Sequence, residues 1–519
     1  MHLRTKNAAL ISTNFHKITP HSALITPHST LRTPHSKLTM KFKSTLIATL
    51  MLISFTSWTQ SQIAWSPNQD LAPSSSGSNH PHVVLDGSGN PLVVWNHASR
   101  CMFSRWNGTA FTTPVLLNPA NLNVAGADWM GPDIASHGDT VYVVFKEIPE
   151  SSSDSHIYCV HSYDGGANFS TPVRVDYIAD SLSRFPTVTT DDQGNPIVGF
   201  MKFDNSFGES RWAVCRSNDL GNTFLTDVKA SAWSDSKAEI CDCCPGTLTC
   251  SGGHVAMIYR DNNDNIRDTW AGISTDTGNT FSTGIGIDQQ NWFLSACPAN
   301  GPDGIIVGDT LYGTFMNGAS GKNLVYYSKS SITDLSGASA MPLTGTISGL
   351  SQQNYPRMDS DGKAMAIAWQ QVVSGKRQGM LRFTNDISSG LPSELDTITL
   401  DYLSNCDVAV GNGHVHVVWQ NTNTGSIKYR KGDFSPLSST KDNNADLHLS
   451  VYPNPSSGIF YVDSDMDINR ITIFNLFGQV IQTLGPQTKS SSFTLRKSGL
   501  YLVQVETSAG TAIRKIVVK

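Results

Sequence analysis

Four of the nine cysteines in the chain lie within ten positions, in the stretch CDCCPGTLTC at residues 241–250. Thiols at this density support three kinds of chemistry: they bind a soft metal ion such as zinc or copper, they pair as disulfides, or they remain free, as reactive or buried thiols. The spacing C-x-C-C lacks the paired C-x-x-C arrangement of structural zinc sites. The compartment of the protein and the place of this stretch in the fold must narrow the choice.

The segment that begins at Met40 predicts export. Lys41 and Lys43 precede a short apolar run, and small and polar residues follow it. This is the layout of a secretory signal peptide, and the run is too short to span a bilayer. We therefore expect a signal peptide over residues 40–61. Residues 1–39 repeat TPHS with a seven-residue period and no apolar face, so we expect an untranslated or disordered extension there.

The composition indicates an all-β protein without a nucleic-acid partner. Charged residues make up 15% of the chain and the net charge is −5, so no basic surface for nucleic acid is expected. Short apolar or alternating runs lie between clusters of Gly, Ser, Thr and Asn, which is typical of β-strands joined by turns. No apolar run beyond the signal peptide is long enough to cross a membrane, so we expect no transmembrane segment in the mature chain.

A repeat of about fifty to sixty residues organises the region 62–436. HPHVVLDGSGNPLVVW from His80 and FPTVTTDDQGNPIVGF from Phe185 share a proline, an apolar run, a Gly-Asn-Pro turn and a second apolar run that ends in an aromatic residue. Each unit has room for four short strands, which is one blade of a β-propeller. Six or seven blades are possible, and the seven repeat anchors favour seven. The anchors are Pro81, Pro132, Pro186, Pro245, Pro298, Pro356 and Cys406.

A second repeat is in phase with the first. The segments SYDGGANF (162–169), SNDLGNTF (217–224) and STDTGNTF (274–281) fit the pattern S-x-D-x-G-x-x-F. Asp accepts hydrogen bonds from turn amides and Gly adopts the left-handed conformation, so each segment predicts a tight turn. These segments resemble the Asp-box (BNR) repeats of the sialidase-like propeller superfamily, whose sialidases have six blades. In such a fold the boxes lie away from the ligand funnel, and we expect them to be structural.

The C-terminal part predicts a separate domain. Residues 437–448 are a polar linker, and alternating strands with Gly turns over 449–519 predict a small β-sandwich. The order of the motifs YPNP, G-x-F, N-x-x-G-x-x-V and G-x-Y-x-x-x-V resembles the type A sorting domain of the type IX secretion system. The resemblance implies a partner in that secretion machinery, and a protein that is secreted or held on the outer surface of a Gram-negative bacterium.

The sialidase resemblance implies candidate catalytic residues around the funnel. Such an enzyme grips a carboxylate with arginines and uses an acidic general acid/base and a tyrosine nucleophile supported by a glutamate. The sequence SRFP (183–186) is similar to the Arg-x-Pro signature that places the first arginine, although it falls in the third repeat rather than in the first. The residues available for these roles are Asp128, Glu147, Arg184, Arg260, Tyr355 and Arg357.

The position of the cysteines in the repeats favours disulfides. Cys244 and Cys297 each precede an anchor proline, so the cluster begins an inner strand near the funnel. In an exported protein we expect at least one disulfide from this stretch, and no metal or other cofactor. Cys101, Cys159 and Cys215 fall in or near third strands, where we expect them to be buried as small hydrophobic residues.

Three functions compete at this stage. The first is a secreted sialidase-like glycosidase that acts on acidic glycans. The second is a non-catalytic surface propeller that binds a glycan or a protein. The third is a metalloprotein that uses the cysteine cluster. The fold alone does not choose between them.

Overall fold

The computed structural model describes residues 63–71, 77–151, 153–177, 181–235, 239–335, 338–435, 449–475, 479–508 and 510–519. The expected extension (1–39), signal peptide (40–61) and linker (437–448) lie outside these ranges. Within them the protein is all-β, and its one helix is the 3-10 turn η1 (Ile387–Ser389). No helix of the described ranges is long and apolar enough to span a bilayer.

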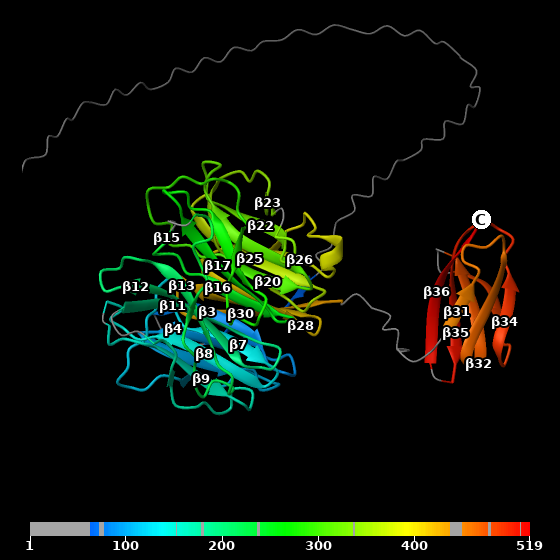
Figure 1. Cartoon of the computed structure of the whole chain (residues 1–519), viewed down its shortest axis with the longest axis horizontal. Helices are drawn as coiled ribbons and strands as arrows, with labels where there is room; N and C mark the ends of the chain where they lie inside the picture. Colours follow the sequence, from blue (N-terminus) through cyan, green and yellow to red (C-terminus); the bar gives the residue numbers. More distant parts are fainter. Residues whose placement is uncertain are drawn as a thin grey trace, which may run out of the picture. The chain divides into compact units, whose positions relative to one another are not determined.

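Seven antiparallel sheets of the described chain follow one another in sequence, and we number them ring sheets 1 to 7 (Figure 1). Ring sheet 1 contains β3 (Ser78–Leu85), β4 (Pro91–His97), β5 (Arg100–Arg105) and β6 (Val115–Leu116). Ring sheet 2 contains β7 (Asp133–His137), β8 (Thr140–Lys146), β9 (Ile157–Ser162) and β10 (Val173–Arg174). Ring sheet 3 contains β11 (Ser181–Thr190), β12 (Pro196–Asp204), β13 (Arg211–Arg216) and β14 (Val228–Lys229).

The next three sheets repeat this order, and ring sheet 4 has a divided inner strand. It contains β15 (Glu239–Ile240) and β16 (Thr247–Ser251), which both pair with β17 (His254–Asn262), and then β18 (Thr269–Ser274) and β19 (Thr283–Gly286). Ring sheet 5 contains β20 (Asp303–Val307), β21 (Thr310–Asn317), β22 (Leu324–Ser331) and β23 (Ser339–Pro342). Ring sheet 6 contains β24 (Leu350–Ser360), β25 (Met365–Val373), β26 (Lys376–Thr384) and β27 (Asp396–Thr399).

Ring sheet 7 is completed from the other end of the chain. Its strands β28 (Leu403–Gly411), β29 (His414–Asn421) and β30 (Ser426–Phe434) follow ring sheet 6. The outer positions are taken by β1 (Ile63–Trp65) and β2 (Gln69–Asp70), which both pair with β30, with Ile63 opposite Phe434. The outer strands of the last ring sheet are therefore supplied by the segment that precedes ring sheet 1.

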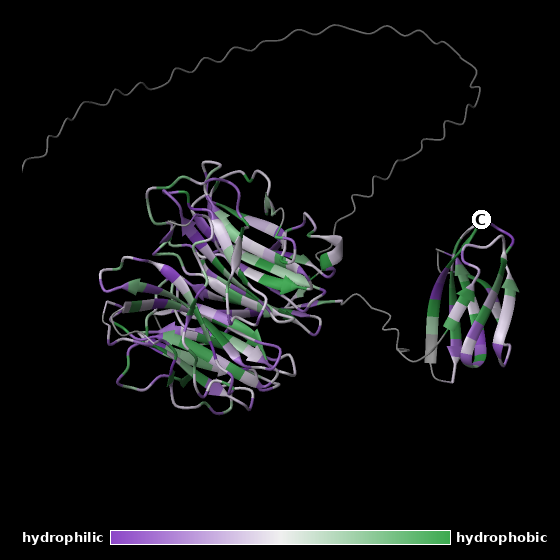
Figure 2. Ribbon diagram, in the orientation of Figure 1, coloured by the Kyte–Doolittle hydropathy of each residue, from purple (hydrophilic) through white to green (hydrophobic). Residues whose placement is uncertain are grey.

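The hydrophobic core closes the sheets into a propeller-like ring. Figure 2 shows hydrophobic stretches along the ring strands. Seven clusters of buried residues each join two consecutive sheets, and the last of them joins ring sheet 7, through Val418, to ring sheet 1, through Val93. A middle strand such as β8 (TVYVVFK) is buried on both faces because it packs between two neighbouring sheets, which explains its continuous apolar run.

The three S-x-D-x-G-x-x-F segments form the same turn. In 217–224 the Ser217 hydroxyl contacts Asp219 Oδ1 at 2.7 Å and accepts the Gly221 N–H at 2.9 Å, and Asp219 Oδ1 accepts the Thr223 N–H at 2.8 Å. Gly221 has φ +88°, which a side chain would strain. The corresponding residues of 162–169 and 274–281 make the same contacts. Each turn joins the third strand of its sheet to the fourth.

One repeat anchor lies elsewhere than expected. The inner strand β20 of ring sheet 5 starts at Asp303, directly after Pro302, and Pro298 lies in the loop before it. The tripeptide Gly301-Pro302-Asp303 repeats Gly131-Pro132-Asp133 at the start of β7. The aligned residue is therefore four positions later than the pattern of proline after cysteine suggested.

The C-terminal residues form a further β unit with its own core. It contains β31 (Leu449–Tyr452), β32 (Ile459–Asn475), β33 (Val480–Leu484), β34 (Thr488–Thr494), β35 (Gly499–Thr507) and β36 (Gly510–Val518). The long strand β32 pairs with four of the other strands. Phe460, Ile471, Val503 and Ile516 are among its fully buried core residues.

Candidate functional site

The inner strands of all seven ring sheets surround a cavity of about 380 Å³. Its wall contains polar as well as apolar side chains. In several sheets the residue that follows the repeat anchor lines the cavity. The charged and titratable residues of the wall include His82, Asp133, Asp303, Arg357, Asp359 and Asp407. Sequence reasoning named only Arg357 among these, although the aspartates directly after Pro132, Pro302 and Cys406 were a readable signal.

Four aspartates of the wall each bind the inner strand of the next sheet. Their carboxylates accept hydrogen bonds of 2.7 to 3.1 Å from main-chain N–H groups. The pairs are Asp133 with Val188, Asp303 with Met358, Asp359 with Val410, and Asp407 with Val83. Neighbouring sheets diverge here, so these main-chain N–H groups have no hydrogen-bond partner in an adjacent strand. The carboxylates supply the missing acceptors, and their first role is therefore structural.

The cavity wall shifts the protonation of these carboxyl groups in different directions. Desolvation raises the pKa of Asp303 to about 6 and that of Asp359 to about 7. Burial acts in the same sense on Asp407, but His82 and Arg357 outweigh it and hold its pKa below the usual value. His82 Nδ1 lies 3.3 Å from Asp407 Oδ2 and 3.6 Å from Asp133 Oδ1. The wall thus carries several acids and a single arginine.

One end of the cavity, which we call the mouth, has a distorted backbone. His80, Phe185, Tyr355 and Asn405 directly precede anchors, and their φ angles are between +44° and +53°. The strand register shifts at the same places in β3, β11, β24 and β28. Bulky residues rarely adopt this conformation, and strain of this kind concentrates at functional sites. The bulge, which recurs in these four strands, re-aims the side chain before each anchor at the rim of the cavity.

Three of the predicted site residues meet at the mouth. Asp128, Tyr355 and Arg357 line the same recess, together with His80, His82, Trp129 and Asn405. Burial raises the pKa of Tyr355, and the charge of Asp128 adds to this effect. Within the described part of the chain the half-buried Arg357 side chain makes no hydrogen bond or salt bridge, so its donors face the cavity and the recess.

His80 and Trp129 complete the recess. His80 is 7% exposed, its Nδ1 has no partner among the described residues, and burial lowers its pKa well below the usual range. It lies against Gly131, where an added Cβ would come within 2.6 Å of the imidazole ring. The indole of Trp129 is 39% exposed, which leaves an aromatic face at the rim.

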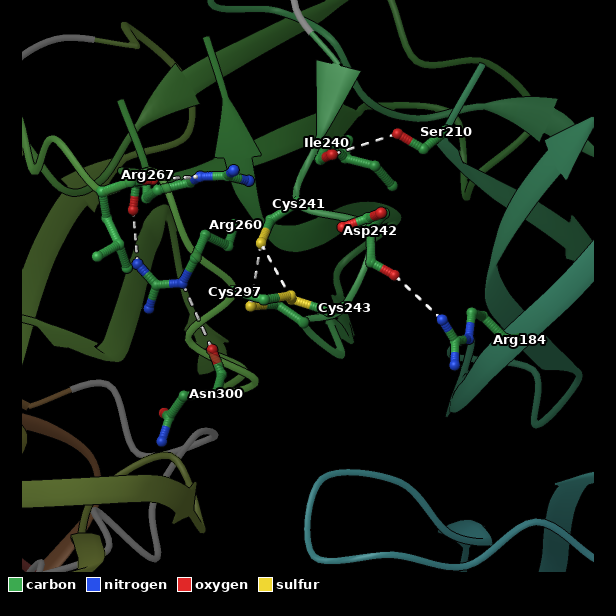
Figure 3. Close-up of a disulfide and its surroundings, with 12 residues drawn as sticks. Arg184, Ser210, Ile240, Cys241, Asp242, Cys243, Arg260, Arg267, Cys297 and Asn300 are labelled. Atoms are coloured by element: carbon green, nitrogen blue, oxygen red, sulfur yellow. Dashed lines mark hydrogen bonds between the residues drawn. A yellow bond between two sulfur atoms is a disulfide. The ribbon is translucent and has the colours of Figure 1, made fainter. Parts of the chain in front are cut away.

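The structure uses the other two predicted arginines to hold the protein together. Arg184 forms an ion pair with Glu150 at 2.7 Å, and its guanidinium lies 4.5 Å from the centre of the Phe185 ring. Its remaining amino group donates to the main-chain oxygen of Asp242 at 3.3 Å (Figure 3). Arg260 is fully buried and donates to the main-chain oxygens of Asn300, Arg267 and Met316.

Glu147 lies outside the mouth recess. It follows β8, and its carboxylate accepts the His156 N–H at 3.4 Å. It neither lines the recess nor contacts Tyr355, so the support that a tyrosine nucleophile needs does not come from this residue in the described geometry. Of the six predicted residues, the structure brings together Asp128, Tyr355 and Arg357.

The cysteine stretch forms the expected disulfide, which joins two ring sheets. Cys243 is bonded to Cys297, with their Cα atoms 6.2 Å apart (Figure 3). The Cys241 sulfur lies 3.6 Å from that of Cys243 and 3.3 Å from that of Cys244. Cys101, Cys159 and Cys215 are buried in β5, β9 and β13, as the sequence predicted.

The comparisons with known proteins identify the C-terminal unit. Residues 450–519 match the family described as "Secretion system C-terminal sorting domain". This domain marks proteins for export by the type IX secretion system to the cell surface or the extracellular space, and the chain therefore engages that machinery. No curated protein matches the chain.

Solved structures that resemble this chain cover about 70% of it. A protein of unknown function from Dyadobacter fermentans is 12% identical, with a TM-score of 0.44 over 72% of this chain and 100% of its own. An ulvan lyase is 9% identical (TM-score 0.47, 69% and 94% covered), and the alpha-L-arabinofuranosidase of Fusarium graminearum is 10% identical (TM-score 0.43, 72% and 98% covered). All three TM-scores lie below 0.5, a level of similarity that does not identify a shared activity.

Proposed function

We propose that the ring is a seven-bladed β-propeller that binds an acidic glycan at the mouth of its central cavity, outside the cell. The C-terminal unit is proposed to be the β-sandwich of the sorting domain, over residues 449–519. Because the sorting domain directs the protein out of the cell, the glycan is expected in the extracellular space. Seven consecutive four- or five-stranded sheets and seven inter-sheet clusters support the blade count.

The observation that carries this proposal is the unpaired guanidinium of Arg357. Among the described residues it makes no hydrogen bond or salt bridge, although its charge acts on the carboxyl groups of Asp303 and Asp407 in the cavity wall. A guanidinium donates two parallel hydrogen bonds to a carboxylate or a sulfate, which are the groups that distinguish acidic sugars. Trp129 offers an exposed indole against which the apolar face of a sugar ring packs.

Two mouth residues have the chemistry for cleavage of the bound glycan. Asp128 is a half-buried carboxyl group suited to general acid/base work, and the hydroxyl of Tyr355 lies in the same recess. We assign Asp128 as the proton donor and Tyr355 as the group that approaches the reacting carbon, in the manner of a glycoside hydrolase. Burial raises the pKa of Tyr355, so the tyrosine is protonated in the empty site. In the proposed step Asp128 gives its proton to the leaving glycosidic oxygen as the C–O bond breaks, and its carboxylate then accepts the proton of Tyr355 as the tyrosine oxygen bonds to the reacting carbon.

The second candidate is a non-catalytic glycan-binding propeller. Arg184 is paired with Glu150 and Arg260 donates to main-chain oxygens. This favours the non-catalytic candidate, because a sialidase needs several free arginines in one funnel. Both candidates bind an acidic sugar through Arg357, and only the first cleaves it.

The test uses the exported protein and a panel of sialylated, uronate-containing, sulfated and neutral oligosaccharides. We expect binding of one acidic class, and a loss of about 10- to 100-fold in affinity for Arg357→Gln, since a charged hydrogen-bonded contact contributes about 1.5–3 kcal/mol. Arg216→Gln, which alters an arginine outside the mouth, is the matched control. Equal affinity of Arg357→Gln and the wild type would refute the site.

Cleavage is measured separately from binding. If the protein is a glycosidase, the Asp128→Asn variant should bind the glycan with unchanged affinity, and its rate of product formation should fall by about 100-fold or more. If wild-type protein binds the glycan and releases no product over long incubation, the non-catalytic candidate is correct.

A further inference from the structure

The sulfur atoms of four cysteines converge at the boundary between ring sheets 4 and 5. The ligand atoms of Cys241, Asp242, Cys243 and Cys297 all lie within 4.8 Å of one another. The Cys244 sulfur joins them at 3.3 Å from that of Cys241. In Figure 3 the Cys241 side chain lies directly above the Cys243–Cys297 bond. A disulfide between two cysteines needs only two sulfurs, and it leaves the other two unexplained.

The backbone holds three of these sulfurs in place. Cys241 follows β15, and its N–H donates to the Arg260 carbonyl of β17 at 3.0 Å. The Cys244 N–H donates to the Cys241 carbonyl at 3.3 Å, which closes residues 241–244 into a tight turn. The fourth sulfur, of Cys297, comes from the loop before β20 in the next sheet. The four donors thus lie in loops that are held by the strands of two neighbouring sheets.

We propose that Cys241, Cys243, Cys244 and Cys297 bind one soft metal ion, zinc(II) or copper(I), in the reduced protein, and that the Cys243–Cys297 disulfide is the oxidised, metal-free form of the same site. Thiolates at about 2.3 Å from a tetrahedral ion lie roughly 3.8 Å from one another. The separations of 3.3 and 3.6 Å around Cys241 differ from this value by a few tenths of an ångström. Reduction frees the Cys243 and Cys297 sulfurs to move apart around an ion, and the Cys244 sulfur completes the set from its position beside Cys241.

Two buried arginines lie around the cluster. Arg260 is fully buried and Arg267 is 8% exposed, and Figure 3 shows both beside the cysteines. Their positive charges offset part of the excess negative charge that a set of four thiolates carries around a divalent or monovalent ion.

The site is open on one side. Cys241 and Cys244 are buried, whereas Cys297 and Asp242 are exposed, so an ion or a reductant reaches the sulfurs from solvent. Conversion between the two forms is balanced: a dithiol reductant gives two electrons and two protons, the Cys243–Cys297 bond breaks into two thiols, and the reductant becomes a disulfide. Binding of the ion then releases the thiol protons to the solvent.

The test is a titration of the full exported protein with cobalt(II), a spectroscopic substitute for zinc. After reduction with a dithiol and anaerobic desalting, we expect one cobalt(II) per chain with a thiolate-to-cobalt charge-transfer band, and displacement of it by zinc(II). Cys241→Ser and Cys297→Ser should each weaken the affinity by at least tenfold. Cys250→Ser, at the other end of β16, should leave it unchanged.

Two results would overturn the proposal. The first is a reduced, folded wild-type protein in which all four thiols react with an alkylating agent but no charge-transfer band develops. The second is cobalt affinity in the oxidised protein equal to that in the reduced protein, because sulfurs joined in a disulfide are not thiolate ligands. Circular dichroism of each variant separates a loss of ligands from a loss of fold.

Discussion

Asp407 and Val83 lie 324 residues apart in the sequence, and Asp407 Oδ2 accepts a hydrogen bond of 2.8 Å from the main-chain N–H of Val83. The contact joins the inner strands of ring sheets 7 and 1, where the ring closes. The same relation recurs at three other boundaries of the cavity wall, through Asp133, Asp303 and Asp359. The wall aspartates therefore act first as links between sheets.

The Asp407 link predicts a measurable loss of stability. Asp407→Ala leaves the Val83 N–H without its acceptor, and we expect a decrease of about 1–3 kcal/mol in the free energy of unfolding. Asp407→Asn keeps an acceptor oxygen and should cost less. Denaturant unfolding of both variants checks this. If the two substitutions had equal effects, the hydrogen bond would not be the cause.

The raised carboxyl pKa values predict a stability that falls as pH rises. Folded Asp303 and Asp359 retain protons up to about pH 6 and 7, above the ordinary value of 3.8. Their contribution is fully present below that ordinary value and is lost as pH rises through the folded pKa. The melting temperature should therefore decline towards neutral pH. Asp359→Asn should flatten the decline by on the order of 1–3 kcal/mol, since the residue is half-buried. A slope as steep as that of the wild type would contradict this.

The repeated turns predict a structural role for their aspartates. Asp219→Ala removes the acceptor of the Ser217 hydroxyl and the Thr223 amide, so we expect a loss of about 0.5–2 kcal/mol, as for other lost caps. Glycan binding at a permissive temperature should be unchanged. Asn218→Ala, at the neighbouring exposed position, is the control. An unchanged melting temperature with lost binding would place these turns in the site instead.

The disulfide predicts a limited response to reduction. Cys243 and Cys297 close a loop of 54 residues, and its removal by Cys297→Ser should cost about 2–4 kcal/mol. Addition of a reductant under metal-free conditions should lower the melting temperature of the wild type by a similar amount. The same reductant should have no effect on Cys297→Ser, and any large effect there would point to another disulfide.

The sorting domain predicts where a truncated protein accumulates. Deletion of residues 449–519 removes the matched sorting domain and leaves all seven ring sheets intact. We expect a folded ring that remains on the periplasmic side of the outer membrane. Cell fractionation with protease protection measures this, and truncated protein in the medium at the level of the full chain would contradict it.

The sequence was informative where a residue repeats its role in every sheet. The anchors and the S-x-D-x-G-x-x-F segments predicted the sheets and the turns, because a turn is fixed by its own few residues. The fifth anchor was misplaced by four residues, since Cys297-Pro298 imitates Cys244-Pro245 while the strand follows Gly301-Pro302. Local similarity in that case reflected a shared disulfide region and not a shared strand position.

The candidate site was less predictable, because it depends on partners far away in the sequence. From the sequence alone there is no reason to treat Arg184, Arg260 and Arg357 differently, since all three are arginines expected at the rim of the funnel. Only the three-dimensional contacts show that Arg184 pairs with Glu150 and that Arg260 donates to main-chain oxygens, whereas Arg357 makes no hydrogen bond or salt bridge with any described residue. The wall aspartates were missed for the same reason, since their acceptor role lies in the next sheet.

The pairing of β1 with β30 has a consequence for the order of folding. The outer edge of ring sheet 7 comes from Ile63–Trp65, whereas its other strands end at Phe434. Contacts over such a separation form late, because the entropy of closing so long a loop must first be overcome. Sheets 1 to 6 are able to assemble as the chain emerges, but the ring remains an open arc until residue 434 is available. We therefore expect closure of the ring, which pairs its two ends, to come last in folding, after residue 434 has been synthesised.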